Sequence, residues 1–207
     1  PDMRSAGQAR AYMEKLRSIL LFADVSDCKM EEGSLRCDAN VSVRLRGQEK
    51  LGTRTEIKNL NSFRALEKAI EYEAKRQIEA IEDGEEIVQE TRTWDEAKSI
   101  TRSMRSKEEA HDYRYFPEPD LPPLRISQDW VDKVRSSMPE LPEQAGQRLM
   151  EQHGLSSYDA DLMTQNPQIL QFFDETLQLH SDAKVVSNWM MGDLSRLLNQ
   201  NGMEIQD

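Results

Sequence analysis

The chain contains few cysteines, few histidines and no long apolar run. Its two cysteines, Cys28 and Cys37, have no CxxC spacing, so neither a disulfide-stapled secreted scaffold nor a zinc motif is expected. The three histidines (His111, His153 and His180) are scattered, which argues against a Cys/His metal cluster. No apolar stretch could span a bilayer, and the first residues show no signal-peptide core. We therefore expect a cytoplasmic protein with reduced thiols and no membrane partner.

Several signatures of nucleotide and hydrolase chemistry are also absent. The sequence has no GxxxxGK[ST] loop, no GxGxxG after a strand, no HExxH and no GxSxG. Any catalytic site must therefore be built in another way. The formal net charge of -11 argues against a general nucleic-acid binder, although a local basic strip in the first 127 residues is compatible with it.

The period of the hydrophobic residues changes once along the chain. With 207 residues and 37% hydrophobic content, the chain can form one sizeable domain or two small ones. The segment PEPDLPPL at 117–124 predicts an extended connector. Strand-like alternation occurs before it, and the period is helical after it. We expect an α+β domain over residues 1–127, an antiparallel sheet with flanking helices, followed by an all-helical bundle over 128–207.

Two helices are predicted within the first domain. Ser5 and Gln8 form a capping-box pattern at the start of the first helix. The second helix follows the segment NLNS at 59–62, and Gly84 suits its C′ position. Apolar spacing predicts that its buried stripe consists of Phe63, Leu66, Ile70, Ile78 and Ile81.

The segment LRCDANVSVRL at 35–45 alternates between apolar and polar residues, which predicts a strand with two unlike faces. The apolar face, expected in the core, holds Leu35, Cys37, Ala39, Val41, Val43 and Leu45. The polar face holds Arg36, Asp38, Asn40, Ser42 and Arg44. TRTEIKNL at 53–60 predicts a second strand, and a hairpin that pairs even with even positions adds Arg54, Glu56 and Lys58 to this polar face.

This polar face is the best candidate for a functional site. Phosphoryl transfer needs carboxylates and Asn for Mg²⁺, with Arg or Lys for the moving phosphate, and the face offers this mixture. A solvated sheet face is the alternative interpretation. Glu31 and Glu32 precede Gly33, where they form either a polar turn or a pair of metal ligands at the strand entrance.

Two later segments allow a functional and a structural interpretation. In TRSMRSKEEAHDYRYF at 101–116, basic residues and aromatics alternate: Arg102, Arg105, Lys107 and Arg114 with Tyr113, Tyr115 and Phe116. They could hold phosphates and stack bases, or form a strand whose aromatics pack in the core. In NWMMGDLSRLLN at 188–199, helical spacing predicts a core stripe of Trp189, Met190, Leu194, Leu197 and Leu198.

Long strings of the sequence resemble one family. MEEGSLRCDANVSVR, EIKNLNSFRALEKAIEYE, QETRTWDE, TRSMRSKEEAHDYRYFPEPDLPPL and SNWMMGDLSRLLN are similar, in order and over nearly the whole length, to the B subunits of bacterial aspartyl/glutamyl-tRNA(Asn/Gln) amidotransferases. The paralogous archaeal E subunit is an alternative. The resemblance implies a cradle-type, kinase-like domain over 1–127 and a helical domain over 128–207.

The resemblance also implies a function, namely the conversion of Glu-tRNA(Gln) to Gln-tRNA(Gln) and of Asp-tRNA(Asn) to Asn-tRNA(Asn). In this family ATP and Mg²⁺ serve to phosphorylate the side-chain carboxylate of the misacylated tRNA. Ammonia from a partner amidase, the A subunit, then displaces the phosphate, and a small C subunit completes the heterotrimer. The family pattern includes a first half of the cradle and a tail domain that have no counterpart here, so we expect the chain alone to be inactive.

The family motifs and the polar face together give a set of candidate site residues. We expect catalytic roles for Asp38, Asn40, Glu56 and Lys58. We expect cofactor binding by Arg36, Arg44 and Arg92, and metal binding by Glu32 and Glu90. The resemblance does not decide which carboxylate touches Mg²⁺. A non-catalytic module that docks tRNA or partner subunits is the alternative function.

Overall fold

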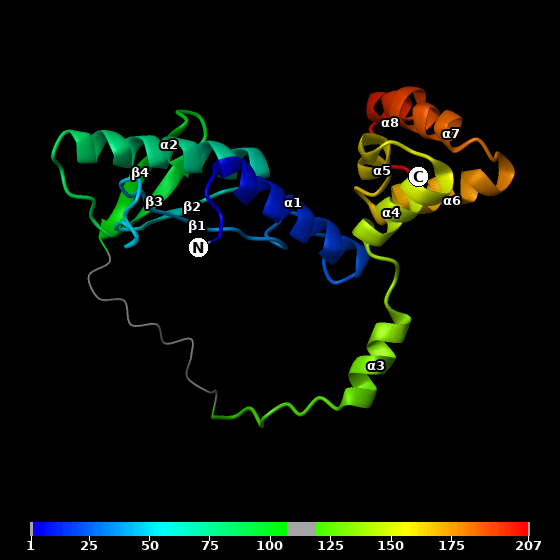
Figure 1. Ribbon diagram of the computed structural model, residues 1–207, viewed down its shortest axis with the longest axis horizontal. Helices are drawn as coiled ribbons and strands as arrows, with labels where there is room; N and C mark the ends of the chain where they lie inside the picture. The colour runs from blue at the N-terminus through cyan, green and yellow to red at the C-terminus, as the bar shows by residue number, and fades with distance from the viewer. Residues whose placement is uncertain (1, 107–118, 207) are drawn as a thin grey trace. The chain divides into compact units, whose positions relative to one another are not determined.

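The computed structural model describes residues 2–106 and 119–206 (Figure 1). The chain divides into two compact units: Pro1–Glu14 with Cys28–Ile126 form unit 1, and Lys15–Asp27 with Ser127–Asp207 form unit 2. The functional domains expected at 1–127 and 128–207 stay a prediction. No helix within the described residues is long and apolar enough to cross a membrane.

The described part of unit 1 contains a four-stranded sheet in the order β1-β2-β3-β4. Its strands are β1 (Ala39–Val41), β2 (Thr55–Lys58), β3 (Glu90–Asp95) and β4 (Ile100–Ser106). The predicted α+β class is confirmed, but the expected antiparallel sheet is wrong at its centre, where β2 and β3 pair in parallel. The reason is the connection: α2 (Phe63–Glu82) carries the chain back across the sheet, and such a crossover joins parallel strands.

The predicted hairpin forms with the predicted parity. Asn40 pairs with Glu56 in the antiparallel register of β1 and β2, so even positions share one face. Ala39 and Val41 are buried while Asn40 is exposed, which confirms the alternation at the centre of the strand. The strand is shorter than predicted, and Leu45 is 73% exposed. It ends early because the Val43 N–H donates to the side chain of Gln77 on α2 (3.2 Å), not to a strand.

Helix α2 lies across one face of the sheet (Figure 1). Ser62 caps it by accepting a hydrogen bond from the Ala65 N–H (3.0 Å), and Gly84 follows its end at φ +82°. The predicted stripe is wrong toward the C-terminal end, where Ile78 and Ile81 are 46% and 41% exposed. The buried row, spaced by three and four residues, comprises Leu66, Ala69, Glu73 and Gln77. Its two polar members are tolerated there because they find hydrogen-bond partners on the strands.

Helix α1 (Ala6–Phe22) begins where the capping pattern predicts. The Ser5 hydroxyl accepts from the Gln8 N–H (3.2 Å), and the Gln8 side chain accepts from the Arg4 N–H (2.7 Å). In unit 1, Arg10 of this helix donates to Glu67 of α2 at 2.9 Å.

The described residues of unit 2 form helices joined by short connections, with no strand. After residue 127 come α3 (Gln128–Ser137), α4 (Pro142–His153), α5 (Ser157–Met163), α6 (Pro167–Leu179), α7 (Ala183–Trp189), the π-helix η2 (Met190–Leu194) and α8 (Ser195–Asn201). Leu149 and Phe173 are at the centre of an apolar core. The stripe predicted over 188–199 is only partly buried: Met190 is in the core, but Trp189 and Leu197 are 63% and 47% exposed. The wider turn of η2 changes the helical spacing there.

Candidate functional site

Four polar residues share the open face of the hairpin, and we refer to Asp38, Asn40, Glu56 and Lys58 as the polar cluster. The Lys58 ammonium lies 2.6 Å from an Asp38 carboxylate oxygen and 3.3 Å from a Glu56 carboxylate oxygen. Asn40 is directly opposite Glu56 in the strand register. The structure therefore brings together the four residues for which the sequence predicted catalytic roles.

The ammonium of Lys58 is the positive centre of the polar cluster. Its hydrogen bond to Asp38 is the main reason why the pKa of Lys58 lies above its ordinary value, with Glu56 adding to the effect. Lys58 is therefore protonated at neutral pH. The side chains of Lys58 and Asp38 are 39% and 45% exposed, and an ion pair this accessible contributes only about 0–1 kcal/mol. An incoming anion or cation can thus replace either partner at small cost.

Glu56 has a second fixed contact, which sequence reasoning missed. The buried Thr91 hydroxyl donates to Glu56 at 3.0 Å, from the strand that pairs in parallel with β2. The register places Thr91 directly beside Glu56. No sequence signal identified this contact, because the alternation of a strand does not show which strand lies beside it or in which direction that neighbour runs.

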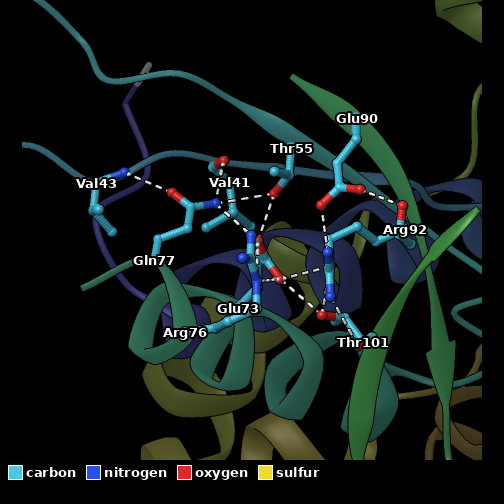
Figure 2. A network of polar contacts seen from close by, with 10 residues as sticks. Val41, Val43, Thr55, Glu73, Arg76, Gln77, Glu90, Arg92 and Thr101 are labelled. Carbon is cyan, nitrogen blue, oxygen red and sulfur yellow. Dashed lines mark hydrogen bonds and ion pairs between the residues drawn. The ribbon is translucent and has the colours of Figure 1, made fainter. Parts of the chain in front are cut away.

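Two other predicted site residues, Glu90 and Arg92, are on the opposite face of the sheet, beneath α2 (Figure 2). Arg92 aligns with the inward-facing Ile57, and a register shift follows Thr91. The Arg92 guanidinium donates to the hydroxyl and carbonyl oxygens of Thr101 (2.8 and 3.0 Å) and to Glu90. The structure therefore does not bring Glu90 and Arg92 into the polar cluster.

A fully buried carboxylate, Glu73, is at the centre of the contacts in Figure 2. It accepts hydrogen bonds from Thr55 (2.9 Å), Thr101 (2.8 Å), Arg76 (2.6 Å) and Gln77 (3.0 Å). Burial alone would raise the pKa of Glu73, but these four hydrogen bonds outweigh it and lower the pKa below its ordinary value. Glu73 is therefore an ionised group inside the core of unit 1.

Sequence reasoning missed Glu73 and Gln77 as structural centres. A signal existed: both residues continue the three- and four-residue spacing of Leu66 and Ala69 on α2. A polar pair in an otherwise apolar row indicates either a helix edge or a buried network. Only the positions of the strand hydroxyls, Thr55 and Thr101, show that it is a network.

The remaining predicted residues occupy separate, exposed places. Glu32 pairs with Lys29 (2.9 Å), the Arg36 guanidinium lies beside Gly33, and Arg44 donates to a backbone carbonyl within its own loop. Of the basic and aromatic segment at 101–116, residues 107–116 lie outside the described part of the chain.

A groove of about 660 Å³ follows the edge of the sheet at β1, between the first half of α1 and α2. Residues 37–44, which include Asp38 and Asn40, line it along the edge strand, and Met13 and Leu66 line it from the helices. Its volume is in the range of small-molecule sites. Two members of the polar cluster, Asp38 and Asn40, therefore border a space that a ligand can enter.

The polar cluster offers part of a ligand set for magnesium. Among the described residues, no group of three or more His, Cys, Asp or Glu side chains is placed to hold a metal. Asp38 and Glu56 provide two carboxylates, and Asn40 provides one amide oxygen. Mg²⁺ commonly takes one or two carboxylates, phosphate oxygens and several waters, so this set fits a partial site that phosphates and further groups complete.

Comparison with known families assigns a class to this chain. Residues 1–132 match the family model described as the GatB/GatE catalytic domain. The chain therefore belongs to the GatB/GatE family, which confirms the resemblance seen in its sequence motifs.

Two curated relatives of the chain have the same name. The chain is 55% identical over all 207 of its residues to the B subunit of the aspartyl/glutamyl-tRNA(Asn/Gln) amidotransferase of Carboxydothermus hydrogenoformans. It is 58% identical over 204 residues, 99% of its length, to the protein of the same name from Moorella thermoacetica. In both cases the chain spans 43% of the relative's length.

Proposed function

We propose that this chain forms part of the B subunit of a tRNA-dependent amidotransferase, with the polar cluster in its reaction site. The substrate would be Glu-tRNA(Gln) or Asp-tRNA(Asn), as the names of the relatives suggest. One observation carries the proposal: a protonated lysine lies between two carboxylates, opposite an asparagine, within the segment that matches a catalytic domain.

The proposed reaction needs an activated carboxylate, because ammonia does not displace an oxygen from a carboxylate ion directly. ATP would supply a phosphoryl group to one oxygen of the substrate side chain, with release of ADP, and Asp38, Glu56 and Asn40 would hold the magnesium that neutralises phosphate charge. Ammonia would then form a bond to the carbonyl carbon and lose one proton to solvent, the bond to the phosphorylated oxygen would break, and phosphate would leave. We propose that a partner amidase (A) subunit provides the ammonia and that a small C subunit joins the two in a heterotrimer.

Each residue of the polar cluster has a role in this scheme. Lys58 would place a fixed positive charge beside phosphate oxygens, where charge develops during phosphoryl transfer. Asp38 and Glu56 orient Lys58 and offer oxygen ligands to magnesium. Asn40 offers a neutral amide to the same space. The exposed Arg36 and Arg44 are proposed to bind phosphate, and Glu32 is proposed as a further metal ligand.

Glu90 and Arg92 have a different position, and we propose an indirect role for them. Both are engaged on the helix-covered face, where the side chains of Arg92 and Glu90 are only 12% and 15% exposed. Direct contact with nucleotide or metal would require their mutual ion pair to open. Their proposed contribution is to hold β3 and β4 in place behind the polar cluster.

The test uses the complete polypeptide assembled with its partner subunits. Asp38→Asn and Lys58→Met should each lower ATP-dependent formation of Gln-tRNA(Gln) by about 100-fold, the effect of removing one group that stabilises a transition state. Stability should change by no more than about 0.5 kcal/mol for Asp38→Asn, because the side chain is half-exposed. Glutamine hydrolysis by the partner is measured separately, so a loss of ammonia supply is recognised.

Two control variants separate chemistry from folding. Glu79→Gln, on the exposed side of α2, should leave both rate and stability unchanged. Cys37→Ser changes the half-buried neighbour of Asp38, so it should lower the melting temperature and keep near-normal activity in the folded fraction. If Asp38→Asn amidates at the rate of the unchanged protein, the polar cluster is not the reaction site, and the docking module becomes the better interpretation.

A further inference from the structure

We propose that Gln77 and Glu73 are positioning residues that set the place of β1, and therefore of Asp38 and Asn40, relative to β2. The inference rests on the proposed function, because it assigns these two buried residues to the same reaction. It goes beyond that function by placing part of the machinery on the other face of the sheet, under α2.

Strand β1 is weakly held by the sheet alone. Within the described residues, it has three residues, is at the edge of the sheet and pairs with one neighbour, through Ala39, Asn40 and Val41. An isolated hairpin pairing of this length is marginal in water, so the ladder by itself does not fix the strand closely. The proposed reaction nevertheless requires Asp38 and Asn40 to stay within contact distance of β2.

Gln77 supplies the missing constraint from α2. Its side-chain N–H group donates to the Val41 carbonyl (3.1 Å), and its side-chain oxygen accepts from the Val43 N–H (3.2 Å) (Figure 2). The Gln77 carboxamide thus bonds to a carbonyl and to an N–H group that are two residues apart along the chain. The peptide group of a neighbouring strand makes the same pair of hydrogen bonds. Gln77 thus pairs with the backbone of the edge strand from the helix side.

Glu73 connects the side chain of Gln77 to strands β2 and β4 through hydrogen bonds. It accepts from the Gln77 N–H group (3.0 Å), from Thr55 on β2 (2.9 Å) and from Thr101 on β4 (2.8 Å). Thr55 in turn accepts from Gln77 (3.0 Å) and is the register partner of Val41. The orientation of Gln77 is therefore set by groups on β2 and β4.

The position of the pair along the strands links it to the polar cluster. Val41 follows Asn40 and Thr55 precedes Glu56, so each contact is one residue away from the proposed site, on the opposite face. Apolar side chains of similar volume at 73 and 77 would fill the same space without burying a charge. Glu73 and Gln77 instead form hydrogen bonds, which depend on direction and therefore fix the position of the β1 backbone.

The central experiment combines Gln77→Met with Asp38→Asn in the complete polypeptide assembled with its partner subunits. Gln77→Met keeps the length of the side chain and removes its hydrogen bonds. We expect kcat for Gln-tRNA(Gln) formation to fall about 10- to 100-fold with little change in KM for the tRNA, because small displacements of reacting groups are costly. Hydrogen exchange in residues 39–45 should become faster.

The double variant tests whether Gln77 acts through Asp38. If it does, adding Gln77→Met to Asp38→Asn should lower the rate by much less than the product of the single effects. Tyr72→Leu is the matched control: it loosens the contact of α2 with Trp94 on β3 and does not remove a bond to β1. Tyr72→Leu should lower stability and keep kcat in the folded fraction.

The outcomes separate the two proposals. If Asp38→Asn alone keeps its rate, the proposed function fails. If Asp38→Asn is impaired while Gln77→Met keeps its kcat, or if the two losses multiply fully, the positioning role is overturned. Should Gln77→Met not fold, Thr55→Val takes its place, because it removes only the hydroxyl that Glu73 and Gln77 share. A Thr55→Val protein with unchanged kcat would then overturn the inference.

Discussion

The two units of this chain differ in the largest polar side chains that they bury completely. In unit 1 the fully buried side chains include Glu73 and Gln77, which bond to the strands around them. In unit 2 the corresponding places are taken by Leu149 and Phe173, within an apolar cluster. Apolar packing is non-directional, whereas hydrogen bonds hold particular atoms at particular places. We infer that hydrogen bonds fix the positions of the strands around the centre of unit 1, whereas apolar packing stabilises the centre of unit 2.

The largest expected effect of a single change is in unit 2. Phe173 is fully buried and meets the His153 ring edge-on, so Phe173→Ala should lower the free energy of unfolding by about 3–5 kcal/mol. Hydrogen exchange at rising urea concentration, followed separately in peptides of α4, α6 and α2, measures the loss in each unit. The neighbouring Phe172 is 37% exposed, so Phe172→Ala is a matched control with a much smaller effect. Equal losses for the two variants would contradict an apolar core centred on Phe173.

The next effect concerns the charge inside unit 1. Glu73→Gln keeps the shape of the side chain but leaves Arg76 and Arg92 without their buried carboxylate. Breaking a buried pair in this way should cost about 3 kcal/mol, and the exchange of α2 peptides should report it while α6 peptides stay unchanged. Glu79→Gln, on the exposed side of the same helix, should change stability by no more than about 0.5 kcal/mol. If Glu73→Gln lowers the free energy of unfolding by less than about 1 kcal/mol, the buried charge contributes little to unit 1, and the proposed contrast with the apolar core of unit 2 is wrong.

The stability of unit 1 at acid pH should also depend on the buried charge of Glu73. The pKa of Glu73 is held below its ordinary value of 4.5, so the folded unit binds a proton at this group less readily than the unfolded chain does. The resulting stabilisation is present above about pH 4.5 and is lost as the pH falls toward the folded-state pKa. Unfolding of unit 1 measured between pH 6 and pH 3 should show this loss, and Glu73→Gln should flatten that part of the curve. An unchanged pH profile in Glu73→Gln would show that Glu73 does not carry the acid sensitivity.

Much of this architecture follows from local sequence patterns. The alternation around Val41, the capping pair Ser5 and Gln8, and the end of α2 at Gly84 all depend on neighbours in the chain, and all three occur as predicted. The parity of the hairpin also follows, because one face must be apolar to be buried. Alternation and parity together are enough to place the four members of the polar cluster on one face.

The parts that sequence did not predict depend on contacts between distant segments. The parallel pairing of β2 and β3 follows from how α2 crosses the sheet, and no local pattern specifies it. The same pairing places Thr91 beside Glu56 and turns Arg92 to the helix side. Hydrophobic spacing also predicted that Ile78 is buried and did not predict the burial of Gln77. Gln77 is buried because it donates a hydrogen bond to Thr55 on β2, and hydrophobic spacing contains no information about such a partner.

The smallest expected effect tests the side of α2 that sequence had assigned to the core. Ile78 is 46% exposed, so Ile78→Ser should change the free energy of unfolding of unit 1 by no more than about 0.5 kcal/mol. Leu66, on the buried row of the same helix, is 2% exposed, and Leu66→Ala should cost about 2–5 kcal/mol. The pair is compared by urea-dependent hydrogen exchange of α2 peptides in otherwise identical chains. If Ile78→Ser lowers the free energy of unfolding by more than about 1.5 kcal/mol, α2 buries the apolar stripe that hydrophobic spacing predicts. The contrast between a polar centre in unit 1 and an apolar core in unit 2 would then be wrong.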